Sequence, residues 1–126
     1  MTPVTMISHF RIKEGKLEAA KAAFASVAAQ LEPSRPRTAV YVAFTDEAGE
    51  RLSIVHVFPD ADALDRHAEG ADERSKAAYE LFEPAGWEFY GRPSAAALDM
   101  VQRQAAEWGV PVRIESESIG GFIRLS

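Results

Sequence analysis

The sequence has 126 residues, of which 47% are hydrophobic and 26% are charged. These values are ordinary for a globular protein, and the chain is long enough for one domain with a substantial core. Nineteen Asp and Glu residues against 14 Lys and Arg residues leave a formal net charge of −5. Because the basic residues are scattered along the chain, we expect no nucleic-acid partner and no binding to anionic lipid.

Several function classes are excluded or disfavoured by what the sequence lacks. It contains no cysteine, which excludes disulfides, thiol nucleophiles and thiolate metal sites. Residues 1–10 carry no basic region that leads into a long apolar run, so no secretion signal is expected. No segment approaches the roughly 20 apolar residues that span a bilayer. We therefore expect a cytoplasmic protein with no membrane partner.

The first third of the chain predicts a strand followed by a helix. Residues Val4–Ile12 alternate between two faces, with Met6 and Ser8 on one and Ile7 and His9 on the other. Apolar residues at spacings of three and four then predict a helix over 16–31. The prolines of the sequence SRPR (34–37) predict a loop after it.

The middle third predicts a β-hairpin that leads directly into a helix. Thr38–Asp46 alternates as a strand, and the turn DEAGE (46–50) joins it to a second strand that ends at Phe58. This second strand is apolar on both faces, which is typical of a central strand. Pro59 ends it because proline has no N–H to donate, and Asp60 stands where a helix N-cap belongs.

The last third predicts two more helices and two short strands. The helix from Asp60 is expected to pause near Gly70. A second helix is predicted over Asp72–Phe82, and EPAG (83–86) is expected to end it before a short strand over Trp87–Tyr90. A third helix is predicted by an apolar stripe of Leu98, Val101, Ala105 and Trp108. Gly109 and Pro111 are expected to end this helix, and a strand is predicted over Val110–Ile114. Residues 120–125 show no pattern that assigns them to an element.

This order of elements, β-α-β-β-α-β followed by α-β, is the ferredoxin-like split βαβ pattern with a C-terminal extension. We expect an α+β fold with an antiparallel sheet in a single domain, residues 1–126, with a core of about 4–93 and an extension of about 94–126. In this topology the helices cover one face of the sheet. Because the strands are apolar on both faces, a second copy of the chain is the simplest cover for the other face, which predicts a homodimer.

Three segments resemble one family of proteins. FRIKEGKLEAAKAAF (10–24) resembles the opening of the antibiotic biosynthesis monooxygenase family, and VFPDADALDRH (57–67) resembles its strand exit, its helix cap and the start of its second helix. FEPAGWEFYGRPS (82–94) resembles the fourth strand of a longer subgroup with an extra C-terminal helix. The resemblance covers roughly Val4–Pro93.

The family resemblance implies a dimeric α+β barrel with a pocket between the sheet and the helices of each subunit. Members include cofactor-free oxygenases of quinols and anthrone-like aromatics, haem-degrading enzymes, and proteins with no established reaction. The matched motifs are mostly helix caps and core spacings, which specify a fold more closely than an activity. The implied activity is that of a monooxygenase, an oxidoreductase, that needs no cofactor.

The sequence also departs from the family in ways that bear on the chemistry. The haem-degrading branch has an asparagine on its first strand, where this chain has Ser8. On its second helix it has a tryptophan and a histidine, where this chain has His67 and Ala77. Haem degradation is therefore disfavoured, and no cofactor is expected. Many quinol-type members carry an acid on the third strand where His56 stands.

His56 is the first candidate for a catalytic residue. It lies inside the predicted central strand, and a semi-buried imidazole held neutral near pH 7 can act as a base toward a phenol or hydroquinone. The alternative is a structural histidine that hydrogen-bonds a neighbour across the sheet. His67, on the second helix, is the other catalytic candidate, and for it the family resemblance implies a structural role or a place at the pocket rim.

The remaining candidates are expected to line a ligand pocket. Ser8 and His9 lie on the first strand, while Tyr41 and Trp87 offer aromatic surfaces on which a flat ligand can stack. The alternative for the aromatic residues is a place in the core or in the dimer interface. Two histidines without a carboxylate or a third ligand make a poor metal site, so we predict no metal.

Two functions stay open from the sequence. The first is a cofactor-independent monooxygenase that deprotonates a small reduced aromatic, quinol-like or anthrone-like, and lets the anion react with O2. The second is a non-catalytic dimeric barrel that binds a small apolar ligand or serves as an assembly module. The resemblance favours the first, and the lack of a complete set of acid and base residues favours the second.

Overall fold

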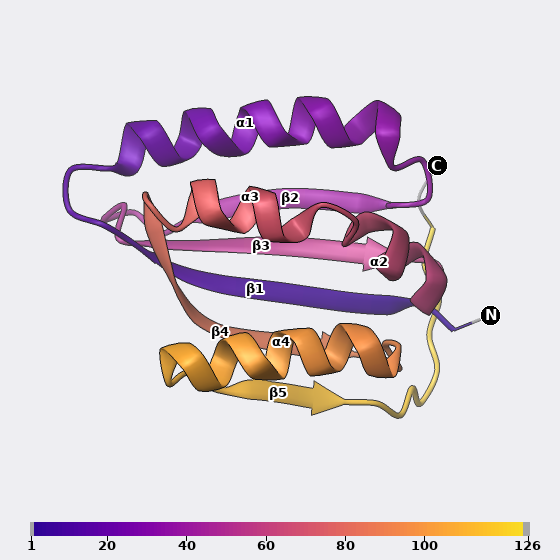
Figure 1. Ribbon diagram of the computed structural model, residues 1–126. Coiled ribbons are helices and arrows are strands. Elements are labelled where there is room, and N and C mark those ends of the chain that lie inside the picture. Colours follow the sequence, from indigo (N-terminus) through magenta and orange to yellow (C-terminus); the bar gives the residue numbers. More distant parts are fainter. Residues whose placement is uncertain (1, 125–126) are drawn as a thin grey trace.

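The computed structural model describes residues 2–124 and shows one five-stranded sheet (Figure 1). The strands lie in the order β2-β3-β1-β4-β5, and all neighbours are antiparallel except β4 and β5. The first four strands therefore have the ferredoxin-like order that the sequence predicts. The strands are β1 (Val4–Ile12), β2 (Val40–Thr45), β3 (Arg51–Phe58), β4 (Phe82–Tyr90) and β5 (Val112–Glu115).

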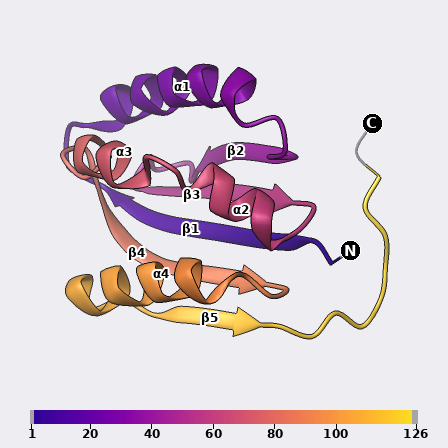
Figure 2. The ribbon, with the colours of Figure 1, turned by 45° about the vertical axis from the view of Figure 1, so that its right-hand side comes forward.

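Four helices lie over one face of this sheet, as the two ribbon views show (Figures 1 and 2). Their apolar residues face the alternate strand residues that are buried, such as Leu52, Ile54 and Phe58 of β3. The predicted pause at Gly70 is present, because Gly70 has a φ of 79° and separates two short helices. The helices are α1 (Leu17–Ser34), α2 (Ala61–His67), α3 (Ala71–Ala78) and α4 (Ala95–Trp108).

Side-chain and glycine caps mark ends of the helices α2 and α4. The Asp60 carboxylate accepts a hydrogen bond from the Ala63 N–H at 2.9 Å, which confirms the predicted N-cap of α2. Ser94 caps α4 in the same way, through the Ala97 N–H at 3.1 Å. Gly109 ends α4 in the left-handed conformation with a φ of 66°, which glycine adopts without strain.

Several predicted boundaries were wrong. The helix expected over Asp72–Phe82 ends at Ala78, because Phe82 is the first residue of β4. Two other differences have a local reason. The helix expected to stop at residue 31 continues through Pro33 to Ser34, whose hydroxyl donates to the Gln30 carbonyl at 2.8 Å. The break expected at 83–86 is instead the first half of β4, with a register shift opposite His9 and Phe10. Because β5 pairs only with Trp87–Tyr90, this half of β4 is a sheet edge, where proline is tolerated.

The other face of the sheet is not covered by any helix of the described chain. It carries Val42 and Phe44 of β2, which are 41% and 64% exposed, together with the half-buried Val55 and Val57 of β3. Residues 116–124 form no helix or strand and run away from the sheet (Figure 2), and Leu125 lies outside the described residues. The expectation that a second chain covers this face stays a prediction.

Candidate functional site

A cavity of about 520 Å³ lies between the helix-covered face of the sheet and the helices. This volume is typical of sites that hold a small organic molecule. Its wall is largely apolar and draws on all four helices and four of the five strands. Its lining residues include Met6, Ser8 and Phe10 of β1, Tyr41 of β2, His56 of β3, His67 of α2, Arg74 of α3, Tyr79, Trp87 of β4, and Gln104 of α4.

The cavity lies where the hydrophobic core divides into two clusters. One cluster, around Phe58, Trp87 and Phe89, packs beneath α2 and α4, and the other, around Phe10 and Leu52, packs beneath α1. A domain of this size usually has one continuous core. Within residues 2–124, the buried polar side chains are Ser8, His56 and His67, and all three line the cavity. The buried polar groups are therefore gathered at the cavity.

His56 is held as a neutral imidazole with one nitrogen free. Its Nδ1 donates to the Met6 carbonyl at 3.0 Å, so Nε2 carries the unprotonated lone pair. Burial lowers the pKa of His56 to about 4, with a smaller lowering from Arg74, while the carbonyl groups of Met6 and Ile54 act in the opposite direction. His56 lines the cavity, as expected, and at neutral pH it can accept a hydrogen bond or a proton there.

His67 and Tyr41 complete an aromatic group around His56. The rings of His56 and His67 are 5.3 Å apart and nearly perpendicular, and the Tyr41 ring is 5.3 Å from the first and 5.2 Å from the second. His67 Nδ1 is 2.9 Å from the Thr38 hydroxyl, and burial followed by the nearby His56 lowers the pKa of His67 to about 3. Burial also raises the pKa of the Tyr41 hydroxyl.

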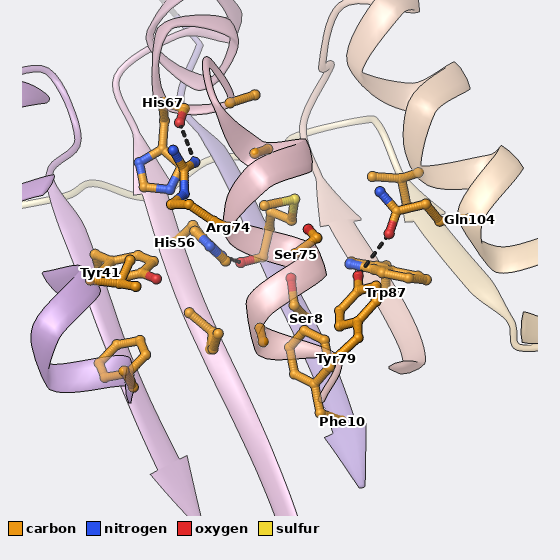
Figure 3. Close-up of a pocket in the computed structure, with 18 of the residues that line it drawn as sticks. Ser8, Phe10, Tyr41, His56, His67, Arg74, Ser75, Tyr79, Trp87 and Gln104 are labelled. Carbon is orange, nitrogen blue, oxygen red and sulfur yellow. Dashed lines mark hydrogen bonds between the residues drawn. The ribbon is translucent and has the colours of Figure 1, made fainter. Parts of the chain in front are cut away.

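Arg74 contributes a cation beside these neutral rings (Figure 3). Its guanidinium donates to the carbonyl groups of His67 and Glu69, each at 2.8 Å, at the point where α2 ends. Burial lowers the pKa of Arg74. The side chain stays a cation at physiological pH, because guanidinium groups do not deprotonate in proteins.

The opposite wall of the cavity is aromatic with fewer polar groups. Figure 3 shows Tyr79, Trp87 and Gln104 on this side, across from Tyr41, His56 and His67. The Tyr79 hydroxyl donates to the Gln104 side-chain oxygen at 2.7 Å, which links the end of α3 to α4. The predicted lining residues Ser8, Tyr41 and Trp87 are therefore all at the cavity.

His9 is not one of the residues that line the cavity, which differs from the expectation. It lies on the uncovered face of the sheet, because side chains alternate along β1 and its neighbour Ser8 points to the helices. Its Nε2 is 2.5 Å from a carboxylate oxygen of Glu88, and its Nδ1 is 2.8 Å from the Ser53 hydroxyl. His9 and His56 are thus on opposite faces and cannot form one site.

Within residues 2–124, no three histidine, aspartate or glutamate side chains come together in a way that suits a metal ion. None of the helices in this part of the chain has the length and apolar character needed to cross a membrane.

Arg74, Tyr79 and Gln104 were not predicted from the sequence as site residues. For Arg74, its helical spacing would have allowed this. Arg74 falls three residues after Ala71 and four before Ala78, on the apolar stripe of α3. A lone arginine on this half-buried stripe indicates a cation that lies toward the sheet. No comparable pattern marks Tyr79 and Gln104, which meet only because α3 and α4 lie on the same side of the sheet.

The arrangement supports two kinds of chemistry. An apolar cavity with aromatic walls suits a flat, largely apolar molecule. A neutral imidazole with a free Nε2, beside a guanidinium, can accept a proton and leave the resulting anion next to a positive charge.

Comparison with known proteins gives structural neighbours at low sequence identity. No protein-family model matches the sequence, and no curated protein matches it. MupZ from Pseudomonas fluorescens has a TM-score of 0.70 and 20% identity, over 96% of each chain. SnoaB from Streptomyces nogalater, a cofactor-independent oxygenase, has a TM-score of 0.61 and 17% identity, over 75% of this chain and 97% of its own.

A third neighbour carries the family name that the sequence motifs suggest. It is a candidate antibiotic biosynthesis monooxygenase from Caulobacter crescentus, with a TM-score of 0.62 and 15% identity, over 69% of this chain and 86% of its own. The chain therefore has the ferredoxin-like α+β fold that the resemblance implies, and the dimer stays a prediction. The match to MupZ covers 96% of this chain, so it includes most of the C-terminal extension, which contains α4 and β5.

Proposed function

We propose that this chain belongs to the antibiotic biosynthesis monooxygenase family and acts as a cofactor-independent monooxygenase of a small, reduced aromatic compound. The observation that carries the proposal is the position of His56, a neutral base whose Nε2 is free, in the wall of an apolar cavity. The fold shared with SnoaB, described as a cofactor-independent oxygenase, supports it.

In the proposed reaction, His56 removes a proton from the substrate, which is a quinol hydroxyl or the CH2 group of an anthrone-like ring. The electron-rich anion then reacts with O2 directly. For the CH2 substrate the balance is CH2 plus O2 to C=O plus water, and for the quinol it is quinol plus O2 to hydroxyquinone plus water. In both reactions the substrate supplies the four electrons that O2 takes up. The apolar wall of the cavity limits the contact of the anion with water.

His67 is the second proposed participant. Its ring is 5.3 Å from that of His56, and its Nδ1 is hydrogen-bonded to Thr38. It also lines a smaller cavity of about 230 Å³ on the outer side of α2, together with Thr38. In the proposal, His67 orients His56 and offers a route by which the proton leaves toward solvent.

The competing proposal is a non-catalytic barrel that binds a small apolar molecule. The observation that favours it is the pKa of about 4 at His56, because so weak a base removes protons poorly near neutral pH. The cavity wall also places no carboxylate in hydrogen-bond contact with either imidazole among the described residues. Under this alternative the imidazoles only accept hydrogen bonds from a bound ligand.

The experiment that separates the two measures oxygen uptake with a hydroquinone and with anthrone as substrates. The oxygenase proposal expects uptake by the wild-type protein and its loss in His56→Ala. His9→Ala is the matched control, because it removes a histidine from the other face of the sheet. Full uptake in His56→Ala would make the proposed role of His56 wrong, and a lack of uptake with a ligand that does bind would favour the non-catalytic alternative.

A further inference from the structure

Arg74 is the one cation among the residues of the described chain that line the cavity. The only other charged lining residue is Glu73, which is exposed and forms no ion pair with it. Most other arginines in this part of the chain do pair with carboxylates: Arg11, Arg37, Arg66, Arg92, Arg103 and Arg113. The positive charge at the cavity therefore has no internal counter-ion.

The structural role of Arg74 uses only part of its hydrogen-bonding capacity. Its two terminal nitrogens donate to the carbonyl groups of His67 and Glu69, which are among the last carbonyl groups of α2 and the turn after it. A cation at a helix C-terminus is favourable on its own. Yet a guanidinium has five N–H groups, and these bonds occupy two of them. Among residues 2–124 the Arg74 side chain makes no other hydrogen bond, and it lies in the cavity wall.

The surroundings of Arg74 favour an anion over a neutral group. The nearby rings of His56 and His67 are neutral, since their pKa values lie near 4 and 3. Arg35 donates to the same Glu69 carbonyl as Arg74, also at 2.8 Å, and brings a second positive charge to this end of the site. A cation that is partly removed from water gains most from a charge-assisted pair, and its planar fork matches a carboxylate.

We propose that the cavity binds a flat, largely apolar molecule that carries one carboxylate, and that Arg74 binds this carboxylate while the aromatic wall holds the rest. The inference takes the cavity of the proposed function as the ligand site and narrows its substrate class to apolar organic acids. Arg74 is in this scheme a binding residue that determines specificity.

The test compares two probes of the same shape that differ in charge, 2-naphthoate and 2-naphthamide, by isothermal titration calorimetry at pH 7.5. We expect the wild-type protein to bind the carboxylate about tenfold more tightly than the amide, as a charge-assisted hydrogen bond predicts. Equal affinity for the two probes, tighter binding of the amide, or binding of neither would overturn the proposal. This comparison needs no mutant, so a folding defect cannot obscure it.

Variants then assign the preference to Arg74. Arg74→Gln is expected to lower the affinity for 2-naphthoate about tenfold and to leave that for 2-naphthamide within about twofold. Arg74→Lys keeps the cation and is expected to keep part of the preference. Arg103→Gln, an exposed arginine on α4, is the matched control and should change neither affinity. A charge preference that survives in Arg74→Gln would overturn the assignment.

The binding proposal and the oxygenase proposal can be contradicted separately. Because 2-naphthoate is not a reduced aromatic, its binding requires no reaction with O2. Binding of 2-naphthoate without oxygen uptake from any hydroquinone or anthrone would remove the oxygenase and leave the anion site in place. Oxygen uptake without a preference for 2-naphthoate over 2-naphthamide would contradict the anion site and leave the oxygenase proposal in place.

Discussion

At the scale of single residues, the two buried histidines connect the site to the stability of the fold. The pKa of His56 falls from an ordinary value of 6.5 to about 4, so the unfolded chain binds a proton at that residue between these pH values and the folded chain does not. The free energy of unfolding therefore falls as the pH is lowered from about 6.5 toward 4. His67 changes in the same direction.

This linkage gives a measurable pH dependence. Between pH 7 and pH 5 we expect the wild-type protein to lose about 2 kcal/mol of unfolding free energy through His56 alone, read from the midpoint of urea unfolding. His56→Gln should show a smaller loss over the same interval. Asp46, Asp60 and Glu88 also have lowered pKa values, but carboxylates titrate below this window. An unfolding midpoint that does not change between pH 7 and pH 5 would contradict the buried, neutral state of His56.

Much of the site could be predicted from the sequence, because many of the site residues lie on strands and the alternation of side chains along a strand is visible in the sequence. Ser8 and His56 lie on strands in which successive side chains point to opposite faces of the sheet, so the sequence positions of the two residues determine which face each one occupies. The same rule already places His9 on the face opposite Ser8, so the expectation that both line the pocket conflicted with the alternation itself. The position of Arg74 near His56 depends on the angle between α2 and α3 at Gly70, and no local sequence pattern predicts that angle.

At the scale of elements, α4 is the helix whose attachment the structure explains most directly. The Ser94 hydroxyl accepts from the Ala97 N–H at 3.1 Å and donates to the Asp65 carboxylate at 2.7 Å, so it caps α4 and ties it to α2. We expect Ser94→Ala to lower the unfolding free energy by about 1 kcal/mol, measured by urea denaturation. Ser116→Ala removes a hydroxyl from the exposed C-terminal segment and should have almost no effect. Equal losses in the two variants would contradict the capping role.

The strand β4 shows where element prediction failed and why. Pro84 and Gly86 are turn residues by local preference, and the sequence therefore indicates a break before Trp87. In the fold, Pro84 pairs with Phe10 at an edge that β5 does not reach, so its missing N–H leaves no ladder bond unmade. The strand extends to Phe82 because tertiary pairing with β1 overrides the local signal.

At the scale of the whole molecule, the two faces of the sheet differ in what covers them. The helix-covered face holds the divided core and the cavity. On the other face, the half formed by β1 and β4 is polar, with the His9–Glu88 and Arg11–Glu83 pairs, while the half formed by β2 and β3 is apolar. An apolar patch next to a polar region is typical of a protein–protein interface.

We therefore predict a homodimer that buries this patch, in which Phe44, 64% exposed in the single chain, is a central contact. Light scattering after size exclusion at micromolar concentration should give twice the chain mass of 13.8 kDa for the wild-type protein. Phe44→Lys should give the monomer mass, because a lysine in an apolar interface leaves a buried charge unpaired. Ile119→Lys changes an equally apolar, fully exposed residue outside the sheet and should leave the dimer intact. A monomeric wild type would contradict the prediction, and dissociation by Ile119→Lys alone would place the contact on the C-terminal segment.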